Sequence, residues 1–252
     1  MAMPFEIVTI PCLSDNYAFI LHDDATGATA LVDVPEAKPI LEVLENRGWA
    51  LSDVWITHHH DDHVQGLAQV LAHHSATADV HRLPPLDRQI ADGDSFDFAG
   101  HTVQVLDVSG HTLGHIAFYL AEAEAVFTAD SLMALGCGRL FEGTPAQMWK
   151  SLGKLAALPP ETLVCSGHEY TASNAKFALT IDPHNPRLIS RSREVEDSRA
   201  SGIPTVPSAL ALELATNPFL RAADSNIRNR LGLSNASDVD VFTEIRARKD
   251  AF

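Results

Sequence analysis

The 252-residue sequence predicts an α+β protein whose C-terminal part is helical. Up to about residue 168, short apolar or alternating runs typical of strands interleave with runs typical of helices. After that point the runs are all helical and prolines separate them. Hydrophobic residues make up 46% of the chain and charged residues 20%, as in ordinary globular domains. We therefore expect two domains, residues 1–169 and residues 170–252.

The first strands are separated by turns rich in Ser, Asp, Asn and Gly. They are predicted at Phe5–Cys12, Ala18–His22 and Ala28–Val34, with a hairpin loop from Asp23 to Gly27. A helix follows from Pro35 to about Arg47, because Pro35 suits a first helical turn and Gly48 a C-terminal stop. A strand at Asp53–Thr57 then leads through a loop rich in His and Asp into a helix from about Val64 to His74.

The middle of the chain reads as further short strands and one helix. The strands are expected at Asp79–Arg82, Ser95–Phe98, His101–Val108, His115–Leu120, Ala125–Ala129 and Thr162–Cys165. The helix runs from about Pro145 to Leu158, with Thr144 as its N-cap. The helical part of the chain is expected at Thr171–Thr180, Pro186–Ala200, Pro207–Thr216 and Val239–Lys249.

The charge balance argues against two classes of partner, nucleic acids and anionic membranes. Lys and Arg number 18 and Asp and Glu number 33, so the formal net charge is −15. Binding to nucleic acid or to an anionic membrane normally needs a basic face, so we expect neither partner. No stretch approaches the ~18 apolar residues of a transmembrane helix, and the N-terminus lacks the features of a signal peptide. Three scattered cysteines suit a reducing compartment, so we expect a cytoplasmic protein.

Histidine is unusually frequent, with 13 in the chain, and four of them fall within the block from Thr57 to His63. Residues two apart in an extended segment project to the same side, so His58 and His60 can bind one metal ion. Asp62 and His63 follow where the helix begins and can reach a second ion. Imidazole and carboxylate ligands suit zinc, iron or manganese. The absence of cysteine from the block favours an open catalytic site over a closed structural one.

Three later polar residues stand in a similar context, shortly after a predicted strand and among small residues. They are His111, Asp130 and His168. Loops at strand ends are where a rigid scaffold can bring several side chains together. Strands that end together would therefore carry these residues and the Thr57–His63 block to one edge.

This pattern resembles the metallo-β-lactamase superfamily of dinuclear hydrolases. Finer motifs narrow the resemblance to the glyoxalase II, or hydroxyacylglutathione hydrolase, family. They are Gly110–His115, Phe127–Asp130, the Gly-Cys-Gly block at Gly136–Gly143, Cys165–Thr171 and the tail Arg246–Phe252. The resemblance implies a four-layer αββα sandwich and a C-terminal helical domain that closes over the substrate.

The resemblance also implies two divalent metal ions, zinc first, with iron or manganese as alternatives. His58, His60 and His111 would hold the first ion, and Asp62, His63 and His168 the second. Asp130 would bridge both ions and orient the hydroxide between them. Asp33 and His115 are candidates for supporting the ligand imidazoles, because the other ring nitrogen of a ligand histidine usually needs a hydrogen-bond partner.

The implied reaction is hydrolysis of an S-(2-hydroxyacyl)glutathione, such as S-D-lactoylglutathione, to glutathione and D-lactate. The bridging hydroxide would attack the thioester carbonyl. The thiolate would leave without a strong general acid, because the pKa of a thiol is far below that of an alcohol. We therefore expect a small-molecule glutathione thioester as the partner, and a monomeric protein.

The glutathione-binding residues of the family match Arg139, Phe141, Tyr170, Arg246 and Lys249. Arg139 stands where the family has Lys, which keeps the charge but changes the geometry. Phe141 stands where the family has Tyr, which removes one hydroxyl hydrogen bond. Both changes concern affinity or acyl preference rather than the type of reaction. The basic residues near the C-terminus would offset locally the repulsion between an anionic substrate and the net charge.

Three other functions stay open. A glutathione persulfide dioxygenase on the same scaffold would use one iron and oxygen, so metal counting and oxygen uptake would reveal it. A lactonase or β-lactamase would leave the Arg246–Phe252 tail without a role. A non-catalytic module that holds metal only for stability would have a closed site, for which thiolates are the usual ligands.

Overall fold

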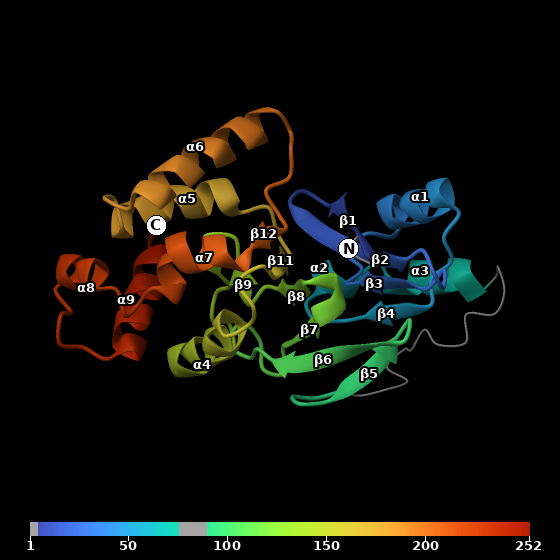
Figure 1. The fold of residues 1–252 in the computed structure, drawn as a ribbon, viewed down its shortest axis with the longest axis horizontal. Helices are drawn as coiled ribbons and strands as arrows, with labels where there is room; N and C mark the ends of the chain where they lie inside the picture. The colour runs from blue at the N-terminus through green and yellow to red at the C-terminus, as the bar shows by residue number, and fades with distance from the viewer. Residues whose placement is uncertain (1–4, 76–89) are drawn as a thin grey trace. The chain divides into compact units, whose positions relative to one another are not determined.

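The computed structural model describes residues 5–75 and 90–252, and Figure 1 labels its helices and strands. The chain divides into two compact units. Unit 1 comprises Met1–Asp107 and Ile116–Phe127, and unit 2 comprises Val108–His115 and Thr128–Phe252. The domain boundary expected between residues 169 and 170 stays a prediction.

The first sheet of unit 1 has four strands in the order β1 (Phe5–Cys12), β2 (Asn16–Asp23), β3 (Thr29–Val32) and β4 (Asp53–Trp55). Short turns join β1, β2 and β3, so these neighbours are antiparallel. β4 runs parallel to β3 because helix α1 (Ala37–Arg47) provides the crossover between them. The hairpin loop predicted after β2 is confirmed, since the Asp23 carboxylate accepts a hydrogen bond from the Thr26 backbone N–H at 3.0 Å.

The second sheet of unit 1 contains β5 (Ser95–Phe98), β6 (His101–Asp107) and β7 (Ile116–Leu120). These strands pair antiparallel in chain order, and β7 pairs in the same way with β8 (Ala125–Ala129). A single 3₁₀ turn, η1 (Ala121–Ala123), joins β7 to β8. β8 begins in unit 1 and its last residues belong to unit 2.

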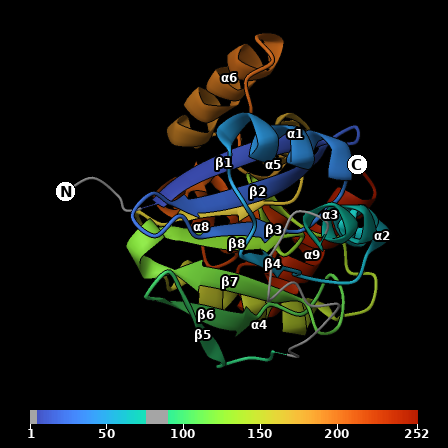
Figure 2. The same cartoon turned by 90° about the vertical axis from the view of Figure 1, so that its right-hand side faces the viewer.

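Aromatic side chains fill the space between the two sheets of unit 1. The ring of Trp55 on β4 lies 5.2 Å from that of Phe98 and 5.4 Å from that of Phe118, measured between centroids. The other face of the first sheet is covered by α1 and α3 (Leu67–Ser75), whose apolar side chains share a core cluster with the strands. Figure 2 shows the resulting order of helix, sheet and sheet in unit 1.

Unit 2 is mostly helical. Its helices are α4 (Pro145–Ala156), α5 (Thr171–Ile181), α6 (Pro186–Ala200), α7 (Leu210–Thr216), α8 (Ser225–Leu231) and α9 (Asp238–Asp250), with a 3₁₀ turn η2 (Pro218–Leu220). Its strands form two short antiparallel pairs, β9 (Leu132–Met133) with β10 (Gly136–Cys137), and β11 (Leu163–Ser166) with β12 (Ser208–Ala209). In the described parts of the chain, no helix combines the length and the apolar character needed to cross a membrane.

The α+β prediction is confirmed, and four elements have the predicted bounds: β1, β5, β8 and α6. Thr144 caps α4 as predicted, and Gln147 completes a capping box with it. The strand predicted at Asp79–Arg82 lies outside the described residues.

Two predicted helices are wrong in extent. The helix predicted from Val64 to His74 is interrupted, because α2 (Asp61–Val64) ends before α3 begins. At the break, Gly66 approaches α1 so closely that an added Cβ would lie 2.8 Å from the Ala37 nitrogen. The helix predicted from Pro207 starts only at Leu210, because Ser208 and Ala209 pair with β11. The seven-residue helix α8 was not predicted; it buries a single side chain, Ile227, and so has almost no apolar periodicity.

Candidate metal centre

One buried carboxylate organises the histidine-rich loop of unit 1. Asp33 follows β3, and its side chain accepts hydrogen bonds from the Thr57 backbone N–H (2.9 Å) and the Thr57 hydroxyl (2.8 Å). The same carboxylate lies 2.8 Å from Nδ1 of His63. Asp33 has a φ of 57°, a conformation that few non-glycine residues adopt. The backbone at Asp33 is therefore held in a costly conformation that brings its side chain to both ends of the loop.

These contacts determine which nitrogen of each ring can bind a metal ion. A carboxylate only accepts hydrogen bonds, so Nδ1 of His63 carries the proton and Nε2 carries the lone pair. The Thr57 hydroxyl uses its hydrogen on Asp33, so at 2.9 Å it accepts a hydrogen bond from Nδ1 of His58. His58 and His63 therefore both present Nε2 as a ligand atom.

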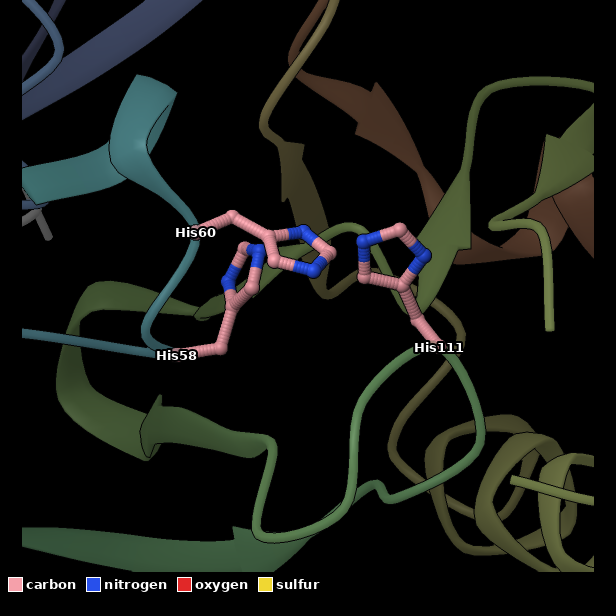
Figure 3. A group of neighbouring side chains, drawn as sticks. All are labelled: His58, His60 and His111. Carbon is pink, nitrogen blue, oxygen red and sulfur yellow. The ribbon is translucent and has the colours of Figure 1, made fainter. Parts of the chain in front are cut away.

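The other predicted ligands of unit 1 lie in the same loop. The ring of His60 is 4.8 Å from that of His58 between centroids, and Figure 3 shows these two side chains leaving one loop together. Asp62 lies in the first turn of α2, where its carboxylate accepts a hydrogen bond from the Asn16 side chain at 3.1 Å. His59, between His58 and His60, is exposed.

Unit 2 brings together the three later predicted ligands. Oδ2 of Asp130 lies 3.3 Å from Nε2 of His111 and 3.3 Å from Nε2 of His168. All three side chains are buried. Asp130 directly follows β8 and His168 closely follows β11, and the two loops are tied by a hydrogen bond from the Gly167 N–H to the Ala129 carbonyl (3.0 Å).

The donor set of unit 2 fits a cation. His111, also labelled in Figure 3, donates from Nδ1 to the Arg139 backbone carbonyl at 2.8 Å. In the neutral ring Nε2 therefore carries a lone pair that faces the Asp130 carboxylate. Two hydrogen-bond acceptors at 3.3 Å repel each other, and a metal ion bound to both removes that repulsion. His115, predicted to support a ligand, is fully buried in the same loop, with its ring 6.1 Å from that of His111.

The Gly-Cys-Gly block closes against this half of the site. A Cβ added at Gly138 would lie 1.9 Å from the Asp130 carbonyl oxygen and 3.0 Å from Nδ1 of His111. The Gly138 N–H also donates to the Ser131 carbonyl at 3.1 Å. Only glycine allows the chain to pass this close to a ligand loop.

The predicted glutathione-binding aromatics lie beside His111 and His168, the predicted ligand histidines of unit 2. Tyr170 stacks on His168, with centroids 4.7 Å apart and ring planes 7° apart. Phe141 contacts His111 edge to face at 5.3 Å and is 64% exposed. Both rings can therefore contact a small molecule that binds next to these imidazoles.

The predicted basic residues have different environments. Arg246 is buried and donates from Nη1 to the Cys137 carbonyl at 2.9 Å, and its Nη2 lies 2.8 Å from the Asp250 carboxylate. Lys249 is partly buried, with Nζ 5.2 Å from the centres of the Phe177 and Phe252 rings. Burial, and then repulsion from the nearby Arg246 and Arg139 guanidinium groups, lowers the pKa of Lys249 to about 8.

Two residues that contact predicted ligands, Thr57 and Asn16, were not predicted from the sequence. Thr57 opens the histidine block and could have been singled out as a hydroxyl next to a ligand. Asn16, which bonds the Asp62 carboxylate, lies within β2, 46 residues earlier, and no local pattern marks it.

Comparison with known proteins identifies first the class and then the family. Residues 80–168 match the metallo-beta-lactamase superfamily, and residues 169–252 match the hydroxyacylglutathione hydrolase C-terminus. Together with the fold, the imidazole and carboxylate clusters define a metallo-β-lactamase-type protein and support the binding of divalent metal.

Full-length relatives define the family. The hydroxyacylglutathione hydrolase of Roseobacter denitrificans is 70% identical, and the alignment covers 99% of this chain and 100% of that protein. The hydroxyacylglutathione hydrolase of Ruegeria pomeroyi is 64% identical with the same coverage. The chain therefore belongs to the hydroxyacylglutathione hydrolase family. A solved structure of TTHA1623 in a di-iron-bound form is similar at 25% identity and a TM-score of 0.57, covering 85% of this chain and 100% of that one.

The close approach at Gly138 generates a prediction. Gly138→Ala forces the backbone away from Asp130 and His111, so we expect a loss of about 1–3 kcal/mol in the free energy of unfolding and metal binding weaker by about 10–100-fold. Thermal unfolding and competition with a metal chelator measure the two effects. Gly153→Ala is the matched control, because Gly153 is an exposed residue of α4 with nothing near its added Cβ, and should be neutral or stabilising by up to about 1 kcal/mol. Unchanged metal affinity in Gly138→Ala would contradict the role given to this contact.

Proposed function

We propose that this protein is a metal-dependent thioesterase that hydrolyses S-(2-hydroxyacyl)glutathione, such as S-D-lactoylglutathione, to glutathione and a 2-hydroxy acid. The observation that carries the proposal is the 70% identity to a hydroxyacylglutathione hydrolase over 99% of the chain. That similarity includes the ligand loops of both units and the helical C-terminal part. Carboxylate and imidazole donors without thiolate also suit a catalytic metal site better than a structural one.

We further propose that the chain binds a pair of divalent ions, as the family resemblance implies. His58, His60 and His111 would hold one ion, Asp62, His63 and His168 the other, and Asp130 would bridge them. Zinc is the first candidate, with iron or manganese as alternatives. Support comes from the protonation pattern of the rings and from the similarity to a protein solved in a di-iron-bound form. Bound ions of this kind supply an acidified water and Lewis-acid stabilisation of a carbonyl oxygen.

The chain's own residues would prepare the attacking water and the ligand rings. Asp130 has two carboxylate oxygens with several lone pairs, so it would have acceptor capacity both for the ions that it bridges and for a hydrogen bond from the water. Asp33 keeps the Nδ1 proton on His63, and through the Thr57 hydroxyl it does the same for His58. The new bond joins the water oxygen to the acyl carbon, and the bond to sulfur breaks. A thiol pKa of about 8.5 lets the thiolate leave without a strong acid.

We propose that Lys249 and Arg139 bind the carboxylates of glutathione. Both charges lie in unit 2, and they offset locally a net charge of −15 that would otherwise repel the substrate. Tyr170 would add its hydroxyl, whereas Phe141 would add only apolar contact. Arg246 would act mainly by adding positive potential and by holding the Cys137 carbonyl.

We also propose that the enzyme is a monomer and that it is located in the cytoplasm. We propose that it consists of a catalytic domain at residues 1–169 and a helical domain at residues 170–252. The three cysteines are free and buried, which is compatible with a reducing compartment.

Metal removal tests the reaction. Chelation should abolish hydrolysis of S-D-lactoylglutathione, and zinc, iron or manganese should restore it. Asp130→Ala should lower kcat/KM by more than the roughly 10–100-fold typical of losing an outer partner of a ligand. His59→Ala is the control, because His59 is an exposed neighbour of two proposed ligands and should keep near-normal activity. Hydrolysis that survives chelation, or oxygen uptake with one iron per chain, would disprove the thioesterase proposal.

The pKa of Lys249 predicts the pH dependence of substrate binding. A lysine with a pKa of about 8 is charged below that pH, and its charged fraction falls from about nine-tenths to about one-tenth between pH 7 and pH 9. KM should therefore rise across this range while kcat changes less. Lys249→Arg should keep KM low at high pH because a guanidinium stays protonated, and Lys249→Ala should have a high KM throughout. A KM that rises equally in Lys249→Arg would show that another group titrates.

A further inference from the structure

The segment from Asp130 to Arg139 is a buried loop with little regular structure. Every residue from Ser131 to Gly138 is buried, and only β9 and β10, of two residues each, pair within it. One non-glycine residue with positive φ directly precedes the loop, Ala129 with a φ of 41°, and another lies within it, Leu135 with a φ of 56°. A buried loop that lacks extended pairing with neighbouring strands needs side chains as partners for part of its backbone hydrogen bonds.

Three side chains later in the chain provide such partners, from Asn174 in α5, Glu213 in α7 and Asn217 directly after α7. The Asn217 amide donates to the Met133 carbonyl (3.1 Å) and to the Gly136 carbonyl (2.9 Å). The Asn174 amide donates to the Ala134 carbonyl at 3.0 Å. The Glu213 carboxylate accepts a hydrogen bond from the Leu135 N–H at 2.8 Å through Oε2.

Glu213 is the centre of this arrangement. Its side chain is fully buried, and Oε1 forms an ion pair with the buried Arg191 and accepts a hydrogen bond from the Ser208 hydroxyl at 2.6 Å. Oε2 also accepts from the Asn217 amide at 3.2 Å. Breaking a buried ion pair of this kind is costly, because it leaves an uncompensated charge away from water. Glu213 therefore holds both the loop and Asn217, which in turn holds two more loop carbonyls.

The far end of the loop contacts the metal ligands of unit 2. The Gly138 N–H donates a hydrogen bond to the Ser131 carbonyl. The carbonyl of the next residue, Arg139, accepts a hydrogen bond from Nδ1 of His111. The near end of the loop is Asp130 itself. A shift of the loop would therefore move the bridging carboxylate and remove the contact that keeps the Nε2 lone pair of His111 available.

From this continuity we propose that Glu213 is a positioning residue for the metal centre. It acts through the Asp130–Arg139 loop and touches neither metal nor substrate. The helical part of unit 2 would then set metal affinity as well as contact the substrate. The kinetic readout of this inference rests on the proposed thioesterase function, whereas the metal-binding readout does not.

The test measures zinc affinity by chelator competition and the d–d spectrum of the cobalt-substituted protein, on the full chain. Glu213→Gln keeps the size of the side chain but removes the charge that fixes Arg191 and one acceptor of the network. We expect zinc affinity to fall by about 10-fold or more, the cobalt spectrum to change, and kcat to fall while KM stays within about 2-fold. Glu196→Gln, on the exposed face of α6, is the matched control and should change none of these.

A second variant addresses folding. Asn174→Asp keeps the Glu213–Arg191 pair intact and replaces the donor to the Ala134 carbonyl by an acceptor, so it should weaken zinc binding in the same direction. Circular dichroism at low temperature checks that each variant is folded. Folded variants with wild-type zinc affinity and cobalt spectrum would overturn the proposal, and failure of both to fold would show a purely structural role. If the wild-type protein binds zinc but hydrolyses no glutathione thioester, the proposed function fails while the zinc comparison still decides the role of Glu213.

Discussion

The hydrogen bonds made by Nδ1 of His58, His63 and His111 are the constraint on which the proposed metal centre depends. An imidazole binds metal only through a nitrogen that carries a lone pair, so something must hold the proton on the other nitrogen. Here Asp33 does so for His63, the Thr57 hydroxyl does so for His58, and the Arg139 carbonyl does so for His111. The partners have different chemistry, but each leaves Nε2 as the nitrogen whose lone pair can bind a metal ion. The rings are therefore prepared for a metal before it arrives.

The fold supplies these partners by ending strands next to one another. Asp33 follows β3 and the histidine block follows the parallel strand β4, so the carboxylate meets both ends of the block. In unit 2, Asp130 and His168 follow β8 and β11 in the same way. Positive φ values at Asp33 and Ala129 show that the backbone is distorted next to the proposed ligands in both units. Such conformations persist only where the surrounding packing determines them, and the buried sheets provide that packing.

The parts of this account that the sequence could predict are those with a local pattern. Alternation and turns located β1, β5 and β8, and the dense block at His58–His63 pointed to metal because so many polar side chains repel without a cation. The hydrogen bonds that Glu213 and Asn217 make to the loop span 78 to 84 residues, and a buried Glu in a short helix has no sequence signature. The break at Gly66 depends on contact with α1, which periodicity cannot detect. The lowered pKa of Lys249 likewise comes from burial in the folded chain and from the charges of Arg246 and Arg139. Neither the burial nor the approach of Arg139, 110 residues earlier, can be read from the local sequence.

The most direct test of the central claim is a crystal structure of the metal-loaded protein with anomalous scattering recorded at the metal absorption edge. The account predicts two anomalous peaks, one contacted by Nε2 of His58 and His111, the other by Nε2 of His63, with Asp130 reaching both. The Nδ1 atoms of these rings should keep their bonds to Thr57, Asp33 and the Arg139 carbonyl. One peak, or rings turned so that Nδ1 faces the metal, would contradict it.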